Sequence, residues 1–344
     1  MKPLLTAILL AHLVIFMGMR ALQAAPPELY SGAVLVTDQS LAEQKRAMPL
    51  ALRQVLQKLS GVRNFEEHPD LQAELKNARS LAITFYYRNE SRTLPDGEQR
   101  EDVYLVVDFS PPEVDSLLLS LALPVWKPER RPLTTWLIVD DGSSRRIMPI
   151  ELEYAWEAVA AVADARGMPL IRPQPDAEGV YAVDEQLLWG GYTEELADSG
   201  PVDALVMAAR REGPEWNVRL NLEYMDQTRS WRNRNTDLEI ALVEGMQTAI
   251  DEIAAANSIA ASDREQGRIE ITVSGVQTAA EYVQVLSYLQ GLSLVDRVDI
   301  LGALPGKVRF DVTLNALPDY LLRALESDGI LSLTPVTGEY SLDK

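Results

Sequence analysis

The segment WLIVDDGSSRR, residues 136–146, places acidic, hydroxyl and basic side chains next to one another. The apolar residues before them predict a buried strand, so the polar residues would lie at its carboxyl end, where open α/β sheets bind ligands. Carboxylates there could hold a cation, and arginines could hold an anion. The composition D-D-G-S is also typical of an ordinary turn, which is the alternative. The candidate ligand-binding residues are Asp140, Asp141, Ser143, Arg145 and Arg146.

Most signatures of catalysis are missing elsewhere. The chain has no cysteine, and His68 is the single histidine outside the first 24 residues. A Ser–His–acid triad would have to use His68, and no G-x-S-x-G motif accompanies it. Structural zinc normally takes several histidines or cysteines, so the acids around His68 do not predict a metal site. The glycines of LLWGGY, residues 187–192, lack the spacing of a phosphate-binding loop. We therefore predict no catalytic residue, no metal and no cofactor.

One enzymatic alternative remains open. A hydrolase that acts on an envelope polymer needs only two suitably spaced carboxylates. The chain has 51 acidic residues, and the sequence cannot single out a pair among them.

The first 24 residues have the order of a secretory signal peptide. Met1 and Lys2 are followed by an apolar run, and small residues stand near the expected cut after Ala24. An uncleaved anchor is the alternative, although this run is at the lower limit for a spanning helix. No second run of that length follows, so we predict no membrane span in the mature chain.

Composition favours the periplasm. An exported chain without cysteine suits a bacterial envelope better than a disulfide-linked secreted domain. Removal of residues 1–24 takes away Lys2 and Arg20 and changes the formal charge from −19 to −21. Such an excess of acid opposes binding to nucleic acid. The mature chain is long enough for two or three domains.

Two polar segments divide the chain. Residues 125–136 combine prolines and basic residues, and residues 256–269 are small, polar and charged, so both read as connections between domains. We predict a mixed α+β and α/β protein of three small units. Their expected bounds are residues 25–128, 132–261 and 267–344, after a signal peptide at residues 1–24.

The first unit is predicted as strand, helix, hairpin, helix. YSGAVLV is a strand, and an apolar stripe from Leu41 to Leu59 predicts a helix that ends at Gly61. Pro49 lies inside this stripe and predicts a kink or break. PDGE, residues 95–98, predicts the hairpin turn, and a proline-led leucine helix follows.

The middle unit is predicted as a three-layer α/β domain. TTWLIVDD is a nearly continuous apolar strand, and residues 150–167 form an amphipathic helix. Paired strands at residues 203–210 and 215–226 precede a long helix at residues 237–256. Strands that are apolar on both faces and alternate with helices indicate helices on both sides of a sheet.

The last unit is predicted as a ferredoxin-like βαββαβ domain. Thr278 and Glu281 form a capping box for its first helix, whose apolar stripe includes Leu286. A strand at residues 307–314, a second helix and a final strand at residues 330–336 complete the order. The exposed face of strand 307–314 carries mixed charge and no aromatic residue, unlike a base-stacking RNA-binding sheet.

The first and last units share a sequence pattern. YLVVDFSPPEVDSLLLSLALPVW and VRFDVTLNALPDYLLRALESDGIL each combine a strand, a proline and a leucine-rich helix. Two ferredoxin-like units that arrived independently at one pattern would explain this equally well.

Residues 104–141 resemble a family of exported Gram-negative proteins catalogued only as a domain of unknown function, number two-thousand-and-sixty-six. The segments 51–61 and 203–231 fit the same family, although Ala209 stands where glycine is expected. The resemblance covers about residues 28–260 and implies an envelope protein with no known reaction. The matching residues are Asp108, Phe109, Leu118, Leu123, Pro124, Trp126, Arg131, Pro132 and Trp136.

The sequence therefore predicts a non-catalytic periplasmic protein that binds or scaffolds another envelope component, most simply another protein. The carboxylate-dependent hydrolase is the competing hypothesis.

Overall fold

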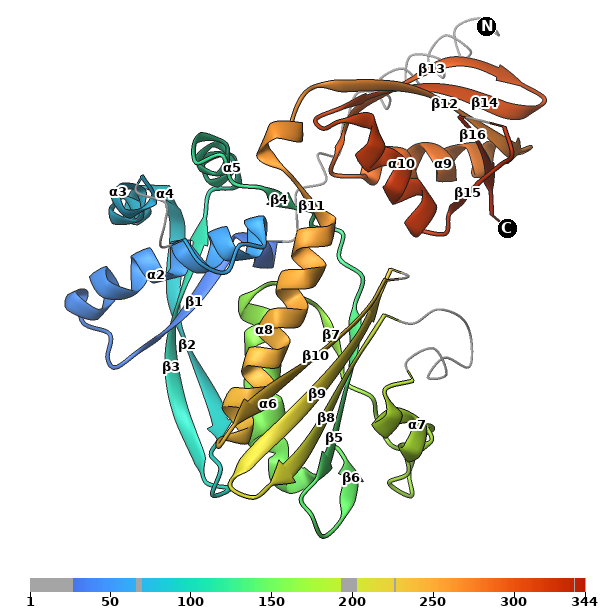
Figure 1. The fold of residues 1–344 in the computed structure, drawn as a ribbon. Coiled ribbons are helices and arrows are strands. Elements are labelled where there is room, and N and C mark those ends of the chain that lie inside the picture. The colour runs from blue at the N-terminus through green and yellow to red at the C-terminus, as the bar shows by residue number, and fades with distance from the viewer. Residues whose placement is uncertain (1–26, 66–69, 193–202, 226, 337, 344) are drawn as a thin grey trace, which may run out of the picture.

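The computed structural model describes residues 27–65, 70–192, 203–225, 227–336 and 338–343. The predicted signal peptide and His68 lie outside these ranges. Within them, helices and strands alternate around several small sheets, as expected for an α+β protein (Figure 1). No helix of the described residues is long and apolar enough to cross a membrane.

The N-terminal sheet has three antiparallel strands in the order β1-β3-β2. Helices cover one face of it and enclose a core that includes Leu52, Leu105 and Phe109. The order strand, helix, hairpin, helix is the predicted one, and two short helices are added before the hairpin. The elements are a 3₁₀ turn η2 (Pro27–Tyr30), β1 (Ser31–Val36), α2 (Leu41–Ser60), α3 (Leu71–Lys76), α4 (Ala78–Leu81), β2 (Ala82–Thr93), β3 (Gln99–Phe109) and α5 (Pro111–Ser120).

Of the kink or break predicted at Pro49, the break does not occur, because helix α2 runs unbroken through this residue. Proline removes one backbone donor, but buried residues on both sides of it, Met48 and Leu52, hold the helix against the core. Tertiary packing therefore outweighs the lost hydrogen bond. The helix is capped by Ser40 at its start and by Gly61 in the left-handed conformation at its end.

The middle sheet follows the order β10-β9-β8-β5-β6, and β7 pairs with the other end of β5. Strands β5 and β8 are parallel, whereas β8, β9 and β10 form an antiparallel meander. Strand β10 was not expected from the sequence. The elements are β5 (Leu133–Asp140), β6 (Arg145–Ile147), a 3₁₀ turn η3 (Ile150–Leu152), α6 (Glu153–Ala165), β7 (Leu170–Ile171), α7 (Glu185–Gly190), β8 (Ala204–Glu212), β9 (Glu215–Tyr224), β10 (Gln227–Asn235) and α8 (Leu238–Asn257).

The two long helices of the middle region, α6 and α8, lie on the same face of this sheet (Figure 1). On the opposite face, the six-residue helix α7 covers Trp136 and Ile138 of β5 through Leu188. The predicted third layer is therefore limited, among the described residues, to the part of the sheet beneath α7. The apolar runs of β5 and β8 account for that part, and the rest of this face carries polar side chains.

The two segments predicted as connections pair with each other. Strand β4 (Val125–Trp126) lies antiparallel to β11 (Ser258–Ile259). A 3₁₀ turn η5 (Ala261–Asp263) then leads into the C-terminal sheet. The segment that leads into the middle region and the segment that leads out of it are therefore paired with each other.

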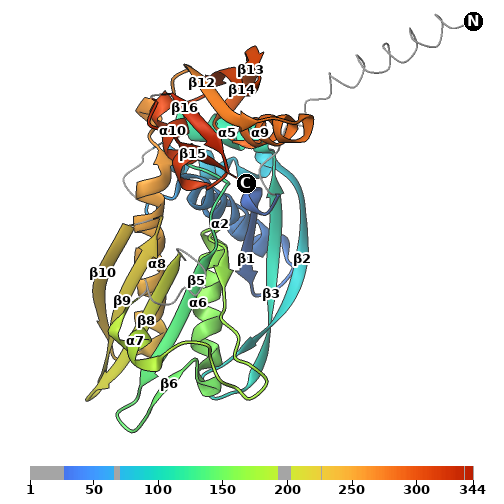
Figure 2. The ribbon, with the colours of Figure 1, turned by 90° about the vertical axis from the view of Figure 1, so that its right-hand side faces the viewer.

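The C-terminal sheet has the order β13-β14-β12-β16-β15, with β12 and β16 parallel. Strands β13, β14 and β12 have the antiparallel order of a ferredoxin-like fold, but β16 runs parallel to β12, where that fold has an antiparallel strand. Helices α9 and α10 cover one face of the sheet (Figure 2). The strand beside β12 is β16, however, and not the predicted strand at residues 330–336, which forms the extra edge strand β15. The elements are β12 (Gly267–Val276), α9 (Ala279–Gly291), β13 (Val295–Leu304), β14 (Gly306–Leu314), α10 (Pro318–Ser327), β15 (Leu331–Leu333) and β16 (Glu339–Leu342).

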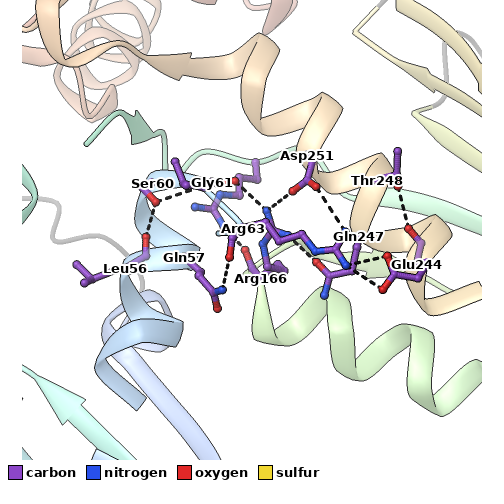
Figure 3. A network of polar contacts seen from close by, with 12 residues as sticks. Leu56, Gln57, Ser60, Gly61, Arg63, Arg166, Glu244, Gln247, Thr248 and Asp251 are labelled. Atoms are coloured by element: carbon purple, nitrogen blue, oxygen red, sulfur yellow. Dashed lines mark hydrogen bonds and ion pairs between the residues drawn. The ribbon is translucent and has the colours of Figure 1, made fainter. Parts of the chain in front are cut away.

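A buried polar network joins the N-terminal helix α2 to α6 and α8 (Figure 3). Arg166, at the end of α6, is 2% exposed and donates to the Gly61 carbonyl at 2.8 Å, to Gln247 at 2.6 Å and to Asp251 at 2.7 Å. Arg63 pairs with Glu244 at 2.8 Å. A buried cation needs several partners, and these partners come from both regions. The network therefore fixes α2 relative to the middle helices.

Candidate anion-binding face

The segment singled out by the sequence forms the end of β5 and a tight turn into β6. Asp141 accepts hydrogen bonds from the Ser143 hydroxyl at 2.7 Å and from the backbone amides of Ser143 and Ser144. These bonds, the Ser143 hydroxyl first, lower the pKa of Asp141 to about 2. Asp141 and Ser143 are thus engaged in the turn itself.

The remaining predicted residues point to two different places. Arg146 contacts Glu151 and Asp141 on the outside of the turn. Asp140 lies between Arg145, at 3.6 Å, and Arg210 of β8, at 3.3 Å. The amide of Gly142, and then Arg210, hold the pKa of Asp140 below its usual value. Asp140 is therefore a charged partner of two arginines and not a proton donor at neutral pH.

Arg145 and Arg210 belong to a larger set that we call the arginine face. Residues that are directly opposite on paired strands lie on the same face of a sheet. One row across the sheet therefore contains, in this order, Arg145, Asp140, Arg210, Asn217 and Arg234. One row further, Ala208 is opposite Arg219, and Arg219 is opposite Arg232. The arginine face consists of Arg145, Arg210, Arg219, Arg232 and Arg234.

Trp189 of α7 lies over this face. Its ring centre is 4.1 Å from the guanidinium carbon of Arg145, 5.5 Å from that of Arg210 and 5.9 Å from that of Arg219. A tryptophan ring attracts cations through its negative face. One aromatic ring thus gathers three guanidinium groups that come from three different strands.

The middle of the face holds polar groups without partners. Nε and Nη2 of Arg219 and Nδ2 of Asn221 are fully covered, and none has a hydrogen bond among the described residues. Gly191, at the end of α7, lies so close to Asn221 that a Cβ added to Gly191 would be 2.3 Å from the side-chain amide nitrogen of Asn221. Buried polar atoms are nearly always satisfied in folded proteins. These donors therefore stand out as polar groups without a partner among the described residues.

The charge of this region is also unbalanced. Arg219 and Arg232 are like charges directly opposite each other, which destabilises a sheet. Burial, and then Arg232, lower the pKa of Arg219. Neither residue, nor Arg234, has an ion pair or hydrogen bond with another described residue. Of the acids on this face, Asp140 is paired with Arg145 and Arg210, and Glu212, Glu215 and Glu223 lie on the rows at its two ends.

Sequence reasoning found one of the five arginines, Arg145. Arg232 and Arg234 were missed because strand β10 was not recognised. Arg210 and Arg219 lie on strands that were predicted, but the sheet order that brings them beside Arg145 was not visible in the sequence. The signal for the strands was present, since WNVRLNLEY and QTRSWRNRN alternate apolar or large residues with polar ones, as strands with one open face do.

Apart from the arginine face, a hollow lies between the middle region and α10 of the C-terminal region. It has a volume of about 960 Å³, and four carboxylates line it with several arginines. Ser293 donates to Glu129 at 2.8 Å, Tyr288 donates to Asp328 at 2.9 Å, and Arg229 lies 3.8 Å from Glu252. Of the four, only Glu326 lacks a hydrogen bond or ion pair among the described residues. Two-carboxylate hydrolysis depends on the separation of the two acids, and three of these four are engaged with other side chains.

The described residues contain no group of three or more His, Asp or Glu side chains placed to hold a metal ion. Asp140 and Asp141 do not converge, since Asp141 is held within the turn and Asp140 faces arginines. The donors of the arginine face suit an anion.

Residues 24–127 match the model of a family described as Domain of unknown function (DUF8605). The inferred family number was thus wrong, although the description as a domain of unknown function is right. The match ends at residue 127, so Arg131, Pro132 and Trp136 lie outside it. No curated protein and no solved structure matches the chain.

Proposed function

We propose that the protein is a non-catalytic periplasmic protein that binds or scaffolds another component of the cell envelope, and that its arginine face binds an acidic segment of a partner protein. One observation carries the proposal. Three arginines in the middle of this face have no acidic partner among the described residues, in a chain with 51 acidic and 32 basic residues.

The geometry suits a carboxylate. Arginine presents a planar fork of donors that matches a carboxylate in two-point contact. Arg219 is partly buried between Trp189 and Arg232, so its hydrogen bonds form with little competition from water. A carboxylate on this row would neutralise the repulsion between Arg219 and Arg232.

The binding test uses the two arginines of strand β10, both of which are exposed. The double variant Arg232→Ser, Arg234→Ser should lose a partner that is crosslinked to the wild-type protein in isolated envelopes. The matched control is Arg297→Ser, Arg309→Ser, which removes the same charge from the C-terminal sheet, where both arginines have acidic neighbours. Because exposed charge pairs are screened by salt, capture should also weaken at 0.5 M salt. Equal capture of the partner by the two double variants contradicts the proposal. Binding of the wild type to anionic lipid vesicles that is as strong as its binding to the partner contradicts it as well.

The location has its own test. If residues 1–24 are removed on export, the mass of the protein from the periplasmic fraction corresponds to a chain that starts at Ala25. An intact N-terminus on membrane-bound protein contradicts the cleaved signal.

The hydrolase hypothesis keeps one candidate residue, Glu326 in the hollow between the middle and C-terminal regions. Release of soluble fragments from a purified envelope polymer, abolished by Glu326→Gln, would favour it over the binding protein.

A further inference from the structure

The outer edge of strand β1 differs from the equivalent edge in the C-terminal sheet. Both sheets begin with a strand and a helix, and in both the first strand pairs with the third, which pairs with the second. In the C-terminal sheet the other edge of β12 is paired with β16 in parallel. No described strand pairs with the corresponding edge of β1.

Side chains of α2 occupy part of this edge instead. The backbone N–H of Ala33 donates to the Gln54 side chain at 2.7 Å, so alternate residues from Ser31 to Leu35 direct their backbone groups away from β3. Lys58 donates to the Ser31 carbonyl at 3.1 Å, and Arg46 donates to the Leu35 carbonyl at 2.9 Å. The Gln54 amide thereby takes the place of a peptide carbonyl on a neighbouring strand.

Two backbone groups on the same edge remain free. The carbonyl of Ala33 and the N–H of Leu35 have no partner among the described residues. They follow one another along the strand and alternate acceptor with donor, as the groups of an unpaired edge do. An added strand would satisfy both and would replace Gln54 at the Ala33 N–H.

A groove of about 450 Å³ runs beside this edge. One wall is α2, with Leu50, Arg53 and Gln54, and the other wall is formed by the end of α6, with Arg166, and the middle of α8, with Gln247. The second wall is fixed, because Arg166 and Gln247 belong to the buried network that joins α2 to the middle helices (Figure 3). The groove is therefore part of the fold itself.

The side chains in the groove specify its occupant. Leu35 is 45% exposed and Leu50 is 41% exposed, so apolar surface lies on either side of the free backbone groups. Arg53 also lines the groove and has no ion pair or hydrogen bond with another described residue. An extended peptide with apolar residues at alternate positions and a carboxylate matches these features.

We propose that the outer edge of β1 binds an extended, acidic peptide segment of a partner protein by strand addition, in the place that β16 holds beside β12. The segment runs parallel to β1, as β16 does to β12. Strand β1 has six residues, which span about 20 Å and set the length of the pairing. This site is separate from the arginine face, so it stands or falls independently of the proposed function.

A second copy of the chain fits this edge less well. The groove is walled by helices on both sides, and a second β1 would bring its own α2 and the same walls with it. A peptide has no such bulk.

The test uses the full chain and a fluorescent seven-residue peptide of sequence EVEVTVE. The control peptide has the same sequence with alternate backbone nitrogens methylated, so that one edge cannot donate. Fluorescence anisotropy should show saturable binding of the first peptide and at least about tenfold weaker binding of the second, since each pairing hydrogen bond contributes about 1 kcal/mol. Equal affinity for the two peptides contradicts backbone pairing.

Two variants separate binding from mere protection of the edge. Ala33→Pro removes the outward N–H at a position where an edge strand tolerates proline, so it should abolish binding while the amides of β3 keep their exchange protection. Gln54→Ala removes the competing amide, so it should bind the peptide several-fold more tightly than the wild type. If Gln54 only protects the edge, Gln54→Ala binds no peptide and the proposal fails. Dissociation of a wild-type dimer by the peptide would instead assign the edge to a second copy.

Discussion

The N-terminal and C-terminal sheets satisfy the outer edge of their first strand in two different ways. Each starts with a strand that needs a neighbour on both edges, and each places its third strand on one of them. Beside β12 the second neighbour is β16, which pairs through its backbone. Beside β1 the neighbours are Arg46, Gln54 and Lys58 of α2, which reach the same backbone groups with their side chains. A fourth strand is therefore replaceable, but side chains leave part of the edge unpaired.

The faces of the two sheets differ in the same sense. The helix-free face of the C-terminal sheet carries ion pairs between its own strands, with Arg309 at 2.9 Å from Glu270 and Arg268 paired with Asp311. The helix-free face of the N-terminal sheet is linked to the middle region, where Arg92 donates to Glu239 at 3.1 Å. Both faces have their charges or donors engaged, in contrast to the arginine face of the middle sheet.

The largest expected effect concerns β16. Tyr340 is 1% exposed and packs in the C-terminal core. Tyr340→Ala should lower the free energy of unfolding of this region by about 3–5 kcal/mol, as removal of a buried aromatic ring does. Hydrogen exchange should show faster exchange along β12 and unchanged exchange along β1 and β3. If β12 keeps its protection, the backbone pairing with β16 is not needed there, and the contrast with β1 disappears.

A smaller effect distinguishes two leucines of α9. Leu289 is fully buried, whereas Leu286, expected on the buried stripe, is only partly buried. Leu289→Ala should cost about 2–5 kcal/mol, and Leu286→Ala should cost clearly less because part of its side chain already contacts water. Denaturant unfolding of the two variants checks the order. The reverse order would mean that α9 packs on the sheet through a different stripe.

Local signals in the sequence predicted most elements of these two sheets. The capping box of Thr278 and Glu281 is present, and the hairpin at residues 95–98 is where PDGE placed it. Such features depend on residues a few positions apart, which the sequence shows directly.

Features that depend on distant residues were missed. The strand beside β12 was assigned to residues 330–336, because an apolar run is a stronger pattern than the short β16, and pairing order is not visible in either. The arginine face needs Arg145 and Arg219 on one surface, and only the sheet order brings them together. Likewise, the apolar strand β5 indicated cover on both faces, but not how little of the sheet α7 would cover.

The helix caps offer a matched pair with an expected effect of about 1 kcal/mol each. Ser40 begins α2 and Thr278 begins α9, and each accepts a hydrogen bond from the backbone amide three residues on at 3.2 Å. Ser40→Ala and Thr278→Ala should therefore destabilise their own regions to a similar extent. Urea unfolding followed separately in the two regions measures this. A much larger loss for Ser40→Ala would show that the start of α2 also supports the edge of β1.

The smallest effect is a pH dependence confined to the β1 edge. Glu43 accepts from Arg46 at 2.8 Å and from the backbone amide of Thr37 at 3.1 Å, and through Arg46 it holds the contact with the Leu35 carbonyl. These two bonds, the one from Arg46 first, lower the pKa of Glu43 from 4.5 to about 2.

Because the folded-state pKa of Glu43 is depressed, its contribution is fully present above pH 4.5 and is lost as the pH falls toward 2. The amide chemical shift of Thr37 should therefore titrate with a midpoint near pH 2, and Glu43→Gln should remove that titration. The pairing of Val273 with Tyr340 uses backbone groups alone, so the Val273 amide should not follow the same curve. Since Glu43 lies in the first turn of α2 and is not part of its core, the change should be local and leave the core of α2 intact. If the amide shift of Thr37 titrates near pH 4.5 instead, Glu43 does not keep its bonds to Arg46 and Thr37. Arg46 is then not fixed at the Leu35 carbonyl and does not replace a neighbouring strand there.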